Sequence, residues 1–474
     1  MTTRDESLAQ ARRHFDEGRF EAELARRVAL RTESDAGPAG PALWAYLRDE
    51  LQPLLSSMGF ACQILDNPVA GGGPFMIAHR HEADDVPTVL GYGHGDVVSG
   101  QEGRWSPGLE PWRLQARDNR FYGRGTADNK GQHSINLAAF AAVLRAREGR
   151  LGYNTTWLFE MGEEAASPGL HAVCEQHREQ LRADLFLSSD GPRVRASRPT
   201  LFLGSRGAVN FSLRLRSRAR PYHSGNWGGV LTNPAVVLSH AVATLVDARG
   251  RLRVPALCPP PPPPSVRAAL ASIPIGDDPD APELDEGWGE PGLSPAERLM
   301  AWNTLEVLAL GAGSAERPIN AIPAEAVAHC QLRFVVGTPW RDLERHVREH
   351  LQKQGFGQVE VSVSISGAAT RLDPSNPWVE WAQRSIERSC GQRADVLPNL
   401  AGSLPNDVFA DLLGMPTLWV PHSYPACAQH APDEHLLAPV VREGLALMAG
   451  LYWDLGEPAA PWREGALASS RALL

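Results

Sequence analysis

Histidine and carboxylate side chains occur at the ends of several predicted strands in this sequence. Zinc takes histidine and carboxylate ligands, and a catalytic zinc site keeps one position open for water. Two metal ions held close together can activate that water and stabilise the oxyanion that forms on an attacked amide. The residue types therefore favour metal-assisted hydrolysis of an amide bond. The candidates are His94 with Asp96, Asp128, Glu163 with Glu164, Asp190, and His430.

The elements that would position these residues alternate between strand and helix. Short apolar or β-branched runs end near His94, Glu163 and Asp190, and helix-like stretches cover 131–147 and 170–181. Such alternation predicts an α/β fold, a mostly parallel sheet with helices on its faces. In open sheets of this kind, ligands bind at the carboxyl ends of the strands. The predicted strands are Thr88–Leu90, Thr155–Phe159, Ala183–Leu187 and Pro416–Val420.

A different pattern begins after Gly204. Segments 209–215 and 326–336 alternate like antiparallel strands with one exposed face, and segments 234–247 and 340–354 look helical. We interpret this region as a small α+β domain, a lid or dimerisation domain inserted within the catalytic domain.

The expected division of the chain follows from this change of pattern. Residues 1–203 form the first part of the catalytic domain, 204–371 the insert, and 372–474 the second part of the catalytic domain. Within the insert, the proline run 259–264 and the acidic stretch 276–290 predict a stiff exposed connection.

Composition excludes several classes of function. The 474 residues exceed what one compact core usually holds, so two domains are expected. The net charge of −9 argues against nucleic acid and against an anionic membrane surface as partners. The six cysteines are scattered without a C-x-x-C pair, which favours free thiols in a reducing compartment. No stretch is long and apolar enough to span a bilayer, so we expect a cytoplasmic protein.

Five sequence blocks around the candidate residues are specific in combination. In their order they resemble the zinc exopeptidase family that includes aminoacylase, acetylornithine deacetylase, glutamate carboxypeptidase and carnosinase, and the resemblance runs from about Glu21 to Leu451. Segments 221–229, 320–326 and 331–334 resemble the carnosinase-like dipeptidase branch. The five blocks are Gly91–Val98, Tyr122–Gly131, Gly162–Gly169, Ser189–Pro192 and His430–His435.

The resemblance implies a metal centre with two Zn²⁺ ions, for which Co²⁺ and Mn²⁺ are alternatives because both suit histidine–carboxylate sites. In this interpretation Asp128 bridges the two metals. His94 and Asp190 complete one metal site, and Glu164 and His430 complete the other. Asp190 stands where other branches of the family carry Glu or His, which favours the dipeptidase branch.

The resemblance also implies the other catalytic and binding residues. Glu163 is the expected general base, which takes a proton from the attacking water and gives it to the leaving amine. Asp96 is expected to hold the metal-binding imidazole from behind. His223 is expected to stabilise the oxyanion from the insert, reaching across from a partner subunit, which implies a homodimer. The substrate-binding candidates, of which the guanidinium fits a carboxylate, are Arg333, Gly402 and Ser403.

Three functions are compatible with these residues. The first is a metallo-dipeptidase or carboxypeptidase, whose substrate is a dipeptide or a C-terminal amino-acid conjugate. The second is an N-acyl amino acid deacylase, which shares every metal ligand and differs only in the substrate pocket. The third is a metal-binding relative without catalysis, against which the intact Glu163 and the full ligand set count. One departure from the family pattern is Asn129, where many carnosinase-like members carry a second Asp.

Three further patterns are interpreted as structural. His346 to His350 spell H-x-x-E-H, a zinc motif, but the charges in 340–354 predict an exposed helix. The glycines at 71–73 lack the Lys-Ser/Thr pair and the helix start of a phosphate loop. Cys427, three residues before His430, is expected to be a buried thiol and not a ligand or a nucleophile.

Overall fold

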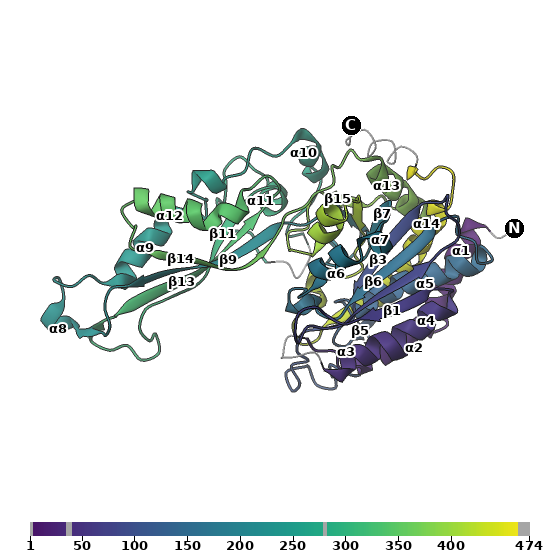
Figure 1. The fold of residues 1–474 in the computed structure, drawn as a ribbon, viewed down its shortest axis with the longest axis horizontal. Helices are drawn as coiled ribbons and strands as arrows, with labels where there is room; N and C mark the ends of the chain where they lie inside the picture. The colour runs from purple at the N-terminus through teal and green to yellow at the C-terminus, as the bar shows by residue number, and fades with distance from the viewer. Residues whose placement is uncertain (1–2, 35–39, 278–281, 463–474) are drawn as a thin grey trace.

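A mixed β-sheet forms the centre of the larger of two lobes in the computed structural model, which describes residues 3–34, 40–277 and 282–462 (Figure 1). Its strands within these residues are β1 (Ala61–Leu65), β2 (Phe75–Arg80), β3 (Thr88–His94), β6 (Asn154–Glu160), β7 (Leu185–Ser188), β8 (Thr200–Phe202), β15 (Asp395–Leu397) and β16 (Thr417–Trp419). They lie in the order β1-β2-β6-β3-β7-β16-β8-β15. The strands from β6 through β3 and β7 to β16 pair in parallel, whereas β1 and β2 form an antiparallel edge. The predicted mostly parallel sheet is therefore confirmed.

Alternation along the strands divides the core of the larger lobe into two layers. On β2, Met76 and Ala78 join one cluster of buried side chains, and Phe75 and Ile77 join the other, because successive side chains of a strand point to opposite faces. The first layer is covered by α1 (Arg4–Asp16), α2 (Arg19–Ala29), α3 (Pro41–Ala45), η1 (Tyr46–Leu51), α4 (Gln52–Ser57), α5 (Lys130–Ala146), α13 (Pro377–Cys390) and α14 (Ala438–Leu455). The second is covered by α6 (Leu170–Gln176), α7 (Arg178–Leu181), α10 (Pro264–Leu270) and α11 (Pro295–Met300). The stretch predicted as one helix over 170–181 is thus two short helices.

The smaller lobe contains an antiparallel sheet with helices on one face (Figure 1). Its strands are β9 (Gly207–Arg216), β11 (Thr304–Gly311), β13 (Glu325–Phe334) and β14 (Glu360–Gly367), in the order β11-β13-β9-β14. On β9, Val209, Phe211 and Leu213 are buried with side chains of α9 (Pro234–Leu245) and α12 (Leu343–Lys353). The predicted strands and helices of this region are present, with ends shifted by a few residues.

An Asn-Pro pair starts two of the main helices. Asn233 and Asn376 accept hydrogen bonds from backbone N–H groups two residues on, at 3.0 Å in both cases. Asparagine satisfies a free N–H of the first turn, and proline fits the first helical position because its missing N–H has no partner there. Among the described residues, no helix is long and apolar enough to cross a membrane.

The segment between β9 and β11 differs from the exposed connection that the proline run predicts. Pro259 and Pro262 are buried, at the threefold spacing of an extended polyproline helix. The run leads into α10, and α11 places Met300 in the same buried cluster as Phe186 of the large sheet. The exposed connection is confirmed at Pro260, Pro261, Pro263 and Pro264 and contradicted at Pro259 and Pro262, because composition does not show which side of a proline-rich segment meets a core. Of the acidic stretch 276–290, residues 278–281 lie outside the described part of the chain.

The chain passes from the large sheet to the small one between Phe202 and Gly207, and it returns between Gly367 and Pro377. The packing of α10 and α11 against the large sheet means that residues 204–371 do not all belong to the smaller core. The domain limits at 204 and 371 stay a prediction.

A close approach between β3 and β6 requires glycine at position 91. Gly91 pairs with Trp157, and a Cβ at position 91 would lie 2.6 Å from the indole ring. We expect Gly91→Ala to lower the free energy of unfolding by about 1–3 kcal/mol, since the buried ring must shift. Gly311→Ala is the matched control in an exposed part of β11, where no described atom lies within 4 Å of the added Cβ. Equal shifts of the urea midpoint in both variants would contradict this account.

Candidate metal centre

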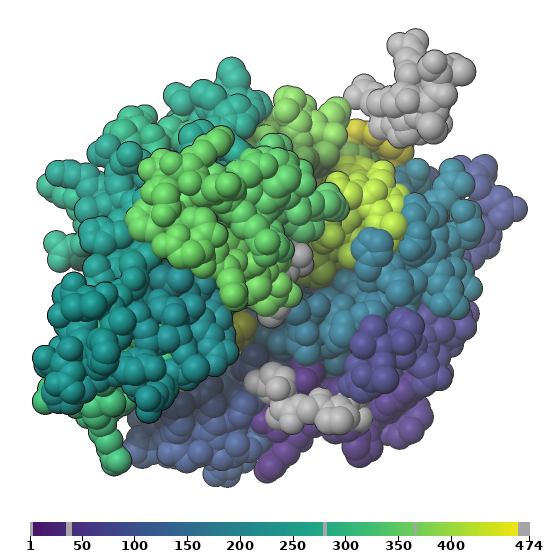
Figure 2. All heavy atoms as spheres, turned by 60° about the vertical axis from the view of Figure 1, so that its left-hand side comes forward, coloured from purple at the N-terminus to yellow at the C-terminus, as the bar shows by residue number. Residues whose placement is uncertain are grey.

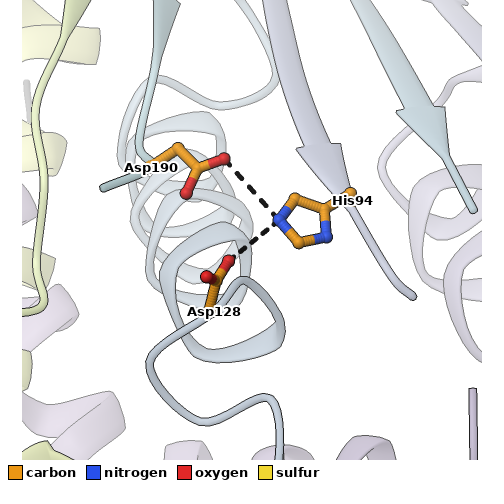
Figure 3. A group of neighbouring side chains, drawn as sticks. All are labelled: His94, Asp128 and Asp190. Carbon is orange, nitrogen blue, oxygen red and sulfur yellow. Dashed lines mark hydrogen bonds and ion pairs between the residues drawn. The ribbon is translucent and has the colours of Figure 1, made fainter. Parts of the chain in front are cut away.

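Two groups of histidine and carboxylate side chains meet at one end of the large sheet. In each group the possible ligand atoms lie within 4.8 Å of one another, and Asp128 belongs to both groups. His94 Nε2 lies 3.0 Å from Asp128 Oδ1 and 3.6 Å from Asp190 Oδ2 (Figure 3). His430 Nε2 lies 3.0 Å from Asp128 Oδ2 and 3.1 Å from Glu164 Oε2. All residues expected to be metal ligands are therefore neighbours, arranged as two pairs around one carboxylate.

Adjacent parallel strands bring most of these residues to one edge. His94 is the last residue of β3, Asp190 lies two residues after β7, and the turn Glu163–Ala165 follows β6. Because β3 pairs in parallel with both β6 and β7, the carboxyl ends of the three strands meet. Asp128 and His430 come instead from loops outside the large sheet.

Asp96 connects the end of β3 to the turn that carries both glutamates. Its Oδ1 accepts a hydrogen bond from the Glu163 N–H at 3.2 Å, and its Oδ2 accepts one from the Glu164 N–H at 3.1 Å. Asp96 Oδ2 also accepts from the Ser34 hydroxyl at 2.5 Å, and Asp96 Oδ1 lies 3.4 Å from His94 Nδ1. The sequence suggested only the contact with the imidazole, whereas the carboxylate also fixes the backbone of the glutamate turn.

Glu434 holds the Asp128 loop although it is not a candidate ligand. Its carboxylate is fully buried. Since Glu434 lies in the same short loop as His430, this side chain joins the two loops that stand outside the large sheet. The donors to its two oxygens are the backbone N–H groups of Gly125 (3.0 Å), Ala127 (2.8 Å) and Asp128 (3.1 Å), and Arg124 Nη1 (2.8 Å).

Asn129, next to the shared carboxylate, links its loop to the one that carries Asp190. Its Nδ2 donates to the Ser189 carbonyl at 2.9 Å, and its Oδ1 lies 3.1 Å from His133 Nδ1. The other ring nitrogen of His133 lies 2.7 Å from the Tyr46 hydroxyl, and all these side chains are buried. An ionised aspartate could not donate to a carbonyl, so the neutral amide suits this network. The peptide bond that precedes Asn129 is cis.

The charge and donor set of the centre fit metal ions. Burial raises the pKa of Glu164 to about 7 and the pKa of Asp190 to about 6, and in both cases the negative charge of Asp128 adds to the effect. Glu164 Oε1 and Asp190 Oδ2 are buried with no hydrogen-bond partner among the described residues. Buried carboxylates of this kind are normally paired with cations or coordinate metals. Both groups offer the histidine nitrogen and carboxylate oxygen that zinc prefers.

The expected substrate residues form a separate polar cluster. Arg333 Nη1 donates to Ser403 Oγ at 2.8 Å, and Ser403 Oγ donates to the Arg206 carbonyl at 2.9 Å. Gly402 directly precedes Ser403 in the loop after β15. Burial lowers the pKa of Arg206 to about 10, with a further contribution from the Arg333 charge, and Arg206 Nη1 has no described hydrogen-bond partner. Two guanidinium groups beside a hydroxyl suit an anionic group.

His223 does not reach the metal centre within one chain. It is exposed in the ribbon formed by β10 (Tyr222–His223) and β12 (Ala321–Ile322), and its Nδ1 accepts a hydrogen bond from the Gly225 N–H at 3.1 Å. The helix that follows, α8 (Ser224–Trp227), lies at the end of the smaller lobe far from the large sheet (Figure 1). Neither metal-ligand group found in the described residues includes His223.

Several contributors were missed from the sequence. Glu434 stands inside the block His430–His435, and its place in that block is the signal that could have drawn attention to it. His133 and Arg206 carry no comparable signal, because each is one histidine or arginine among many. Cys427 is fully buried, and burial raises the pKa of its thiol to about 12, as suits a structural cysteine.

The H-x-x-E-H pattern lies on α12 of the smaller lobe, away from both metal-ligand groups found in the described residues. His350 Nε2 lies 2.8 Å from the Thr244 carbonyl of α9, which explains this histidine as a contact between two helices.

An α/β sheet with two histidine–carboxylate groups at one edge is an arrangement suited to a metal-dependent hydrolase. The model of the family described as "Peptidase family M20/M25/M40" matches residues 90–454. The chain belongs to this peptidase family.

Similar proteins agree with this family. The chain is 26% identical over 348 residues to a cysteinylglycine-S-conjugate dipeptidase from Corynebacterium striatum, covering 72% of this chain and 74% of the relative. It is 23% identical over 407 residues to the Beta-Ala-His dipeptidase of Mus musculus, covering 81% and 80% of the two chains. The solved structure of an M20 family metallo-carboxypeptidase from Sulfolobus solfataricus aligns with a TM-score of 0.77 at 22% identity, covering 92% of this chain and 99% of the other. At that identity the structural likeness shows the fold alone.

Removing the charge of Glu434 tests its role in positioning the Asp128 loop. Glu434→Gln keeps the shape, but the new amide group faces N–H donors and leaves Arg124 without its carboxylate. We expect a loss of about 3 kcal/mol in the free energy of unfolding, as for other buried ion pairs deprived of one partner. We also expect weaker metal binding in a zinc titration, since the loop carries the shared carboxylate.

The matched control for Glu434→Gln is Glu380→Gln. Glu380 is a half-exposed residue on the surface of α13 that pairs with Arg384 at 2.7 Å and with the partly exposed Arg393. An exposed pair contributes up to about 1 kcal/mol, so this variant should unfold near the wild-type midpoint and bind zinc normally. Wild-type zinc affinity in Glu434→Gln would show that the loop is held by other means.

Proposed function

We propose that this chain is a dinuclear metallopeptidase that hydrolyses the amide bond of a dipeptide. The observation that carries the proposal is the pair of ligand groups that share Asp128. The names of two relatives, a cysteinylglycine-S-conjugate dipeptidase and a Beta-Ala-His dipeptidase, support a dipeptide as the substrate class. We propose Zn²⁺ as the metal, with Co²⁺ and Mn²⁺ as alternatives, because all three suit histidine and carboxylate ligands.

The proposed ligands divide between two positions. His94 and Asp190 would hold one ion, Glu164 and His430 would hold the other, and Asp128 would contribute one oxygen to each. When bound, such ions lower the pKa of water and polarise a carbonyl. Asp96 would keep the His94 ring in place, since its backbone carbonyl lies 3.1 Å and its Oδ1 3.4 Å from Nδ1, and a ligand histidine is usually oriented by a partner on its other ring nitrogen.

Glu163 is the residue we assign to proton transfer. Its backbone N–H donates to Asp96 Oδ1 at 3.2 Å, and the charges of His94 and Asp190 act on its carboxyl group. Burial raises the pKa of Glu163 well above the ordinary range, and the neighbouring carboxylate of Asp190 adds to the effect. A raised pKa lets this carboxylate take a proton from the attacking water, hold it on an oxygen, and deliver it to the leaving amide nitrogen.

Arg333 and Ser403 are proposed to bind the C-terminal carboxylate of the substrate, with Gly402 in the same loop and Arg206 beside them. The pairing of Arg333 with Ser403 at 2.8 Å holds the guanidinium near the loop. A fixed fork of N–H donors matches a carboxylate. An N-acyl amino acid presents the same carboxylate, so deacylation is the alternative activity.

The first test compares hydrolysis of dipeptides and N-acyl amino acids by the metal-free protein, the zinc-reconstituted protein and Glu163→Gln. We expect zinc-dependent cleavage, and a loss of about 10²- to 10⁴-fold in kcat in the variant, the usual contribution of a general base. Metal content should be unchanged, because Glu163 is not a proposed ligand. The preferred substrates then separate the dipeptidase from the deacylase.

Glu380→Gln controls for the loss of one glutamate charge and should retain full activity. Full turnover by Glu163→Gln would mean that the base is wrongly assigned. Two bound zinc ions without cleavage of any substrate by the wild type would favour the hypothesis that the chain is a metal-binding relative without catalysis.

We infer that the protein works as a homodimer in which His223 serves the metal centre of the other subunit. His223 is exposed, and within the described residues its backbone pairs with Ala321 and its ring accepts a hydrogen bond from Gly225. The surface around it supports an interface, because β11 is an edge strand with Leu308 and Leu310 exposed. An exposed apolar edge strand is a template for pairing with another chain. Other large apolar side chains exposed on the smaller lobe are Trp227, Val230 and Ile319.

Mixed dimers test whether His223 acts across the interface. Glu163→Gln and His223→Ala should each be inactive alone, while co-expressed subunits should regain about a quarter of wild-type activity, because each mixed dimer contains one complete site. Light scattering should show a dimer for each variant. Absence of regained activity in purified mixed dimers would mean that His223 acts in its own subunit, and full activity of His223→Ala alone would mean that His223 has no catalytic role.

Two further parts of the proposal concern the division of the chain into domains and the cellular compartment. We propose that residues 204–371 serve as the lid and dimerisation region, on the basis of the separate antiparallel sheet that they contribute. The free thiols of all six cysteines support a reducing compartment such as the cytoplasm.

A further inference from the structure

An apolar cavity of about 370 Å³ lies beside the loops that build the metal centre. This volume falls within the range of roughly 300–1,000 Å³ that is typical of ligand pockets. The space-filling view shows the two lobes meeting with a hollow between them (Figure 2). Apolar side chains make up most of the cavity wall, among them Val194, Leu397, Leu400, Ala401, Met300 and Ala426.

The charged side chains in the wall have partners elsewhere. Arg193 Nη1 lies 2.7 Å from Glu443, and Arg195 Nη2 lies 3.3 Å from Asp395. Asp277 is exposed to solvent. The cavity therefore offers an occupant mainly hydrocarbon surface, although Arg193 Nη2 and Arg195 Nε are buried with no hydrogen-bond partner among the described residues.

Three chain segments in the cavity wall lie next to loops of the metal centre, although no candidate ligand itself lines the cavity. The wall segment that contains Val194 begins directly after Asp190, and a Cβ at Gly191 would lie 3.2 Å from Leu400 Cδ2. Ala426 precedes His430 by four residues in the loop that carries the second histidine. The cavity wall therefore adjoins the loops that carry Asp190 and His430.

The wall formed by Leu400 and Ala401 also adjoins the cluster of Arg206, Arg333 and Ser403, called the arginine cluster below. The Arg206 backbone N–H donates to the Leu400 carbonyl at 3.0 Å, and Arg206 Nε donates to the Ala401 carbonyl at 2.9 Å. The next residues of the same loop lead to Ser403, which contacts Arg333. Apolar wall and carboxylate-binding groups are therefore consecutive parts of one loop.

We propose that this cavity binds an apolar side chain on the C-terminal residue of the substrate, which makes the protein selective for dipeptides that end in a large apolar residue. The inference rests on the proposed peptidase activity. The side chain and the carboxylate of the C-terminal residue leave the same Cα, so a carboxylate at Arg333 and Arg206 places the side chain against Leu400 and Ala401. Transfer of a large apolar side chain from water into such a cavity favours its binding.

The zinc-reconstituted protein is assayed against Ala-Gly, Ala-Ala, Ala-Leu and Ala-Phe, and against the reversed pairs Leu-Ala and Phe-Ala. We expect kcat/KM for Ala-Phe to exceed that for Ala-Gly by about tenfold or more, with little gain for the reversed pairs. Free L-phenylalanine should inhibit the wild type about tenfold more strongly than glycine, by the same burial.

Val194→Phe places a ring in the cavity and should remove the advantage of Ala-Phe while sparing Ala-Gly. Val363→Phe is the control on β14, where the native side chain is 41% exposed, and should leave the preference intact. If Val194→Phe does not fold, the inhibition of the wild type by the two free amino acids decides the question.

The possible results distinguish a wrong assignment of the cavity from a wrong assignment of the peptidase activity. Equal kcat/KM for all C-terminal residues, or a preference that follows the N-terminal side chain, overturns the cavity assignment and leaves the peptidase intact. Absence of zinc-dependent cleavage of every dipeptide rejects the proposed function itself and the cavity assignment with it.

Discussion

The shared carboxylate of the metal centre depends on the buried acid Glu434. Its two oxygens accept hydrogen bonds from three backbone N–H groups of the Asp128 loop and from Arg124. A carboxylate buried without such donors costs several kcal/mol, so the loop is held where it satisfies this charge. Glu434 and Asp128 are 306 residues apart in the sequence, and Glu434 shares a loop with His430. One side chain therefore sets the relative position of two distant candidate ligands, Asp128 and His430.

Asp96 does the same for the ligands at the ends of the strands. It contacts the imidazole of His94 and accepts hydrogen bonds from the backbone N–H groups of Glu163 and Glu164. The parallel sheet places these segments side by side, but a strand end alone leaves the following turn free to choose its path. Two buried carboxylates that are not ligands, Asp96 and Glu434, thus convert a sheet edge into a defined set of ligand positions.

The sequence predicted the α/β sheet, and it predicted that the candidate ligands lie together because each stands in a recognisable block, with His94, Glu164 and Asp190 following strands of that sheet. It could not predict the contact of Asn129 with Ser189, which joins residues 60 positions apart and depends on the path of two loops. Nor could it predict that Pro259 and Pro262 turn inward, since burial of a proline run depends on the neighbouring core. Arg206 was missed for a similar reason: only burial beside Arg333 distinguishes it from other arginines.

The arginine cluster stands where the chain crosses between the two lobes, and the crossing itself explains its position. The Thr370 N–H donates to the Ser205 carbonyl at 3.0 Å, and the Leu372 N–H donates to the Leu203 carbonyl at 2.8 Å, so the outgoing and returning segments pair with each other. Asn399 donates to the carbonyls of both Ser205 and Thr370, at 3.3 and 2.7 Å. A buried amide that bonds to both segments joins them to the loop that continues to Ser403. The proposed substrate-binding groups are therefore fixed to the crossing, and the candidate metal ligands to the sheet edge beside it.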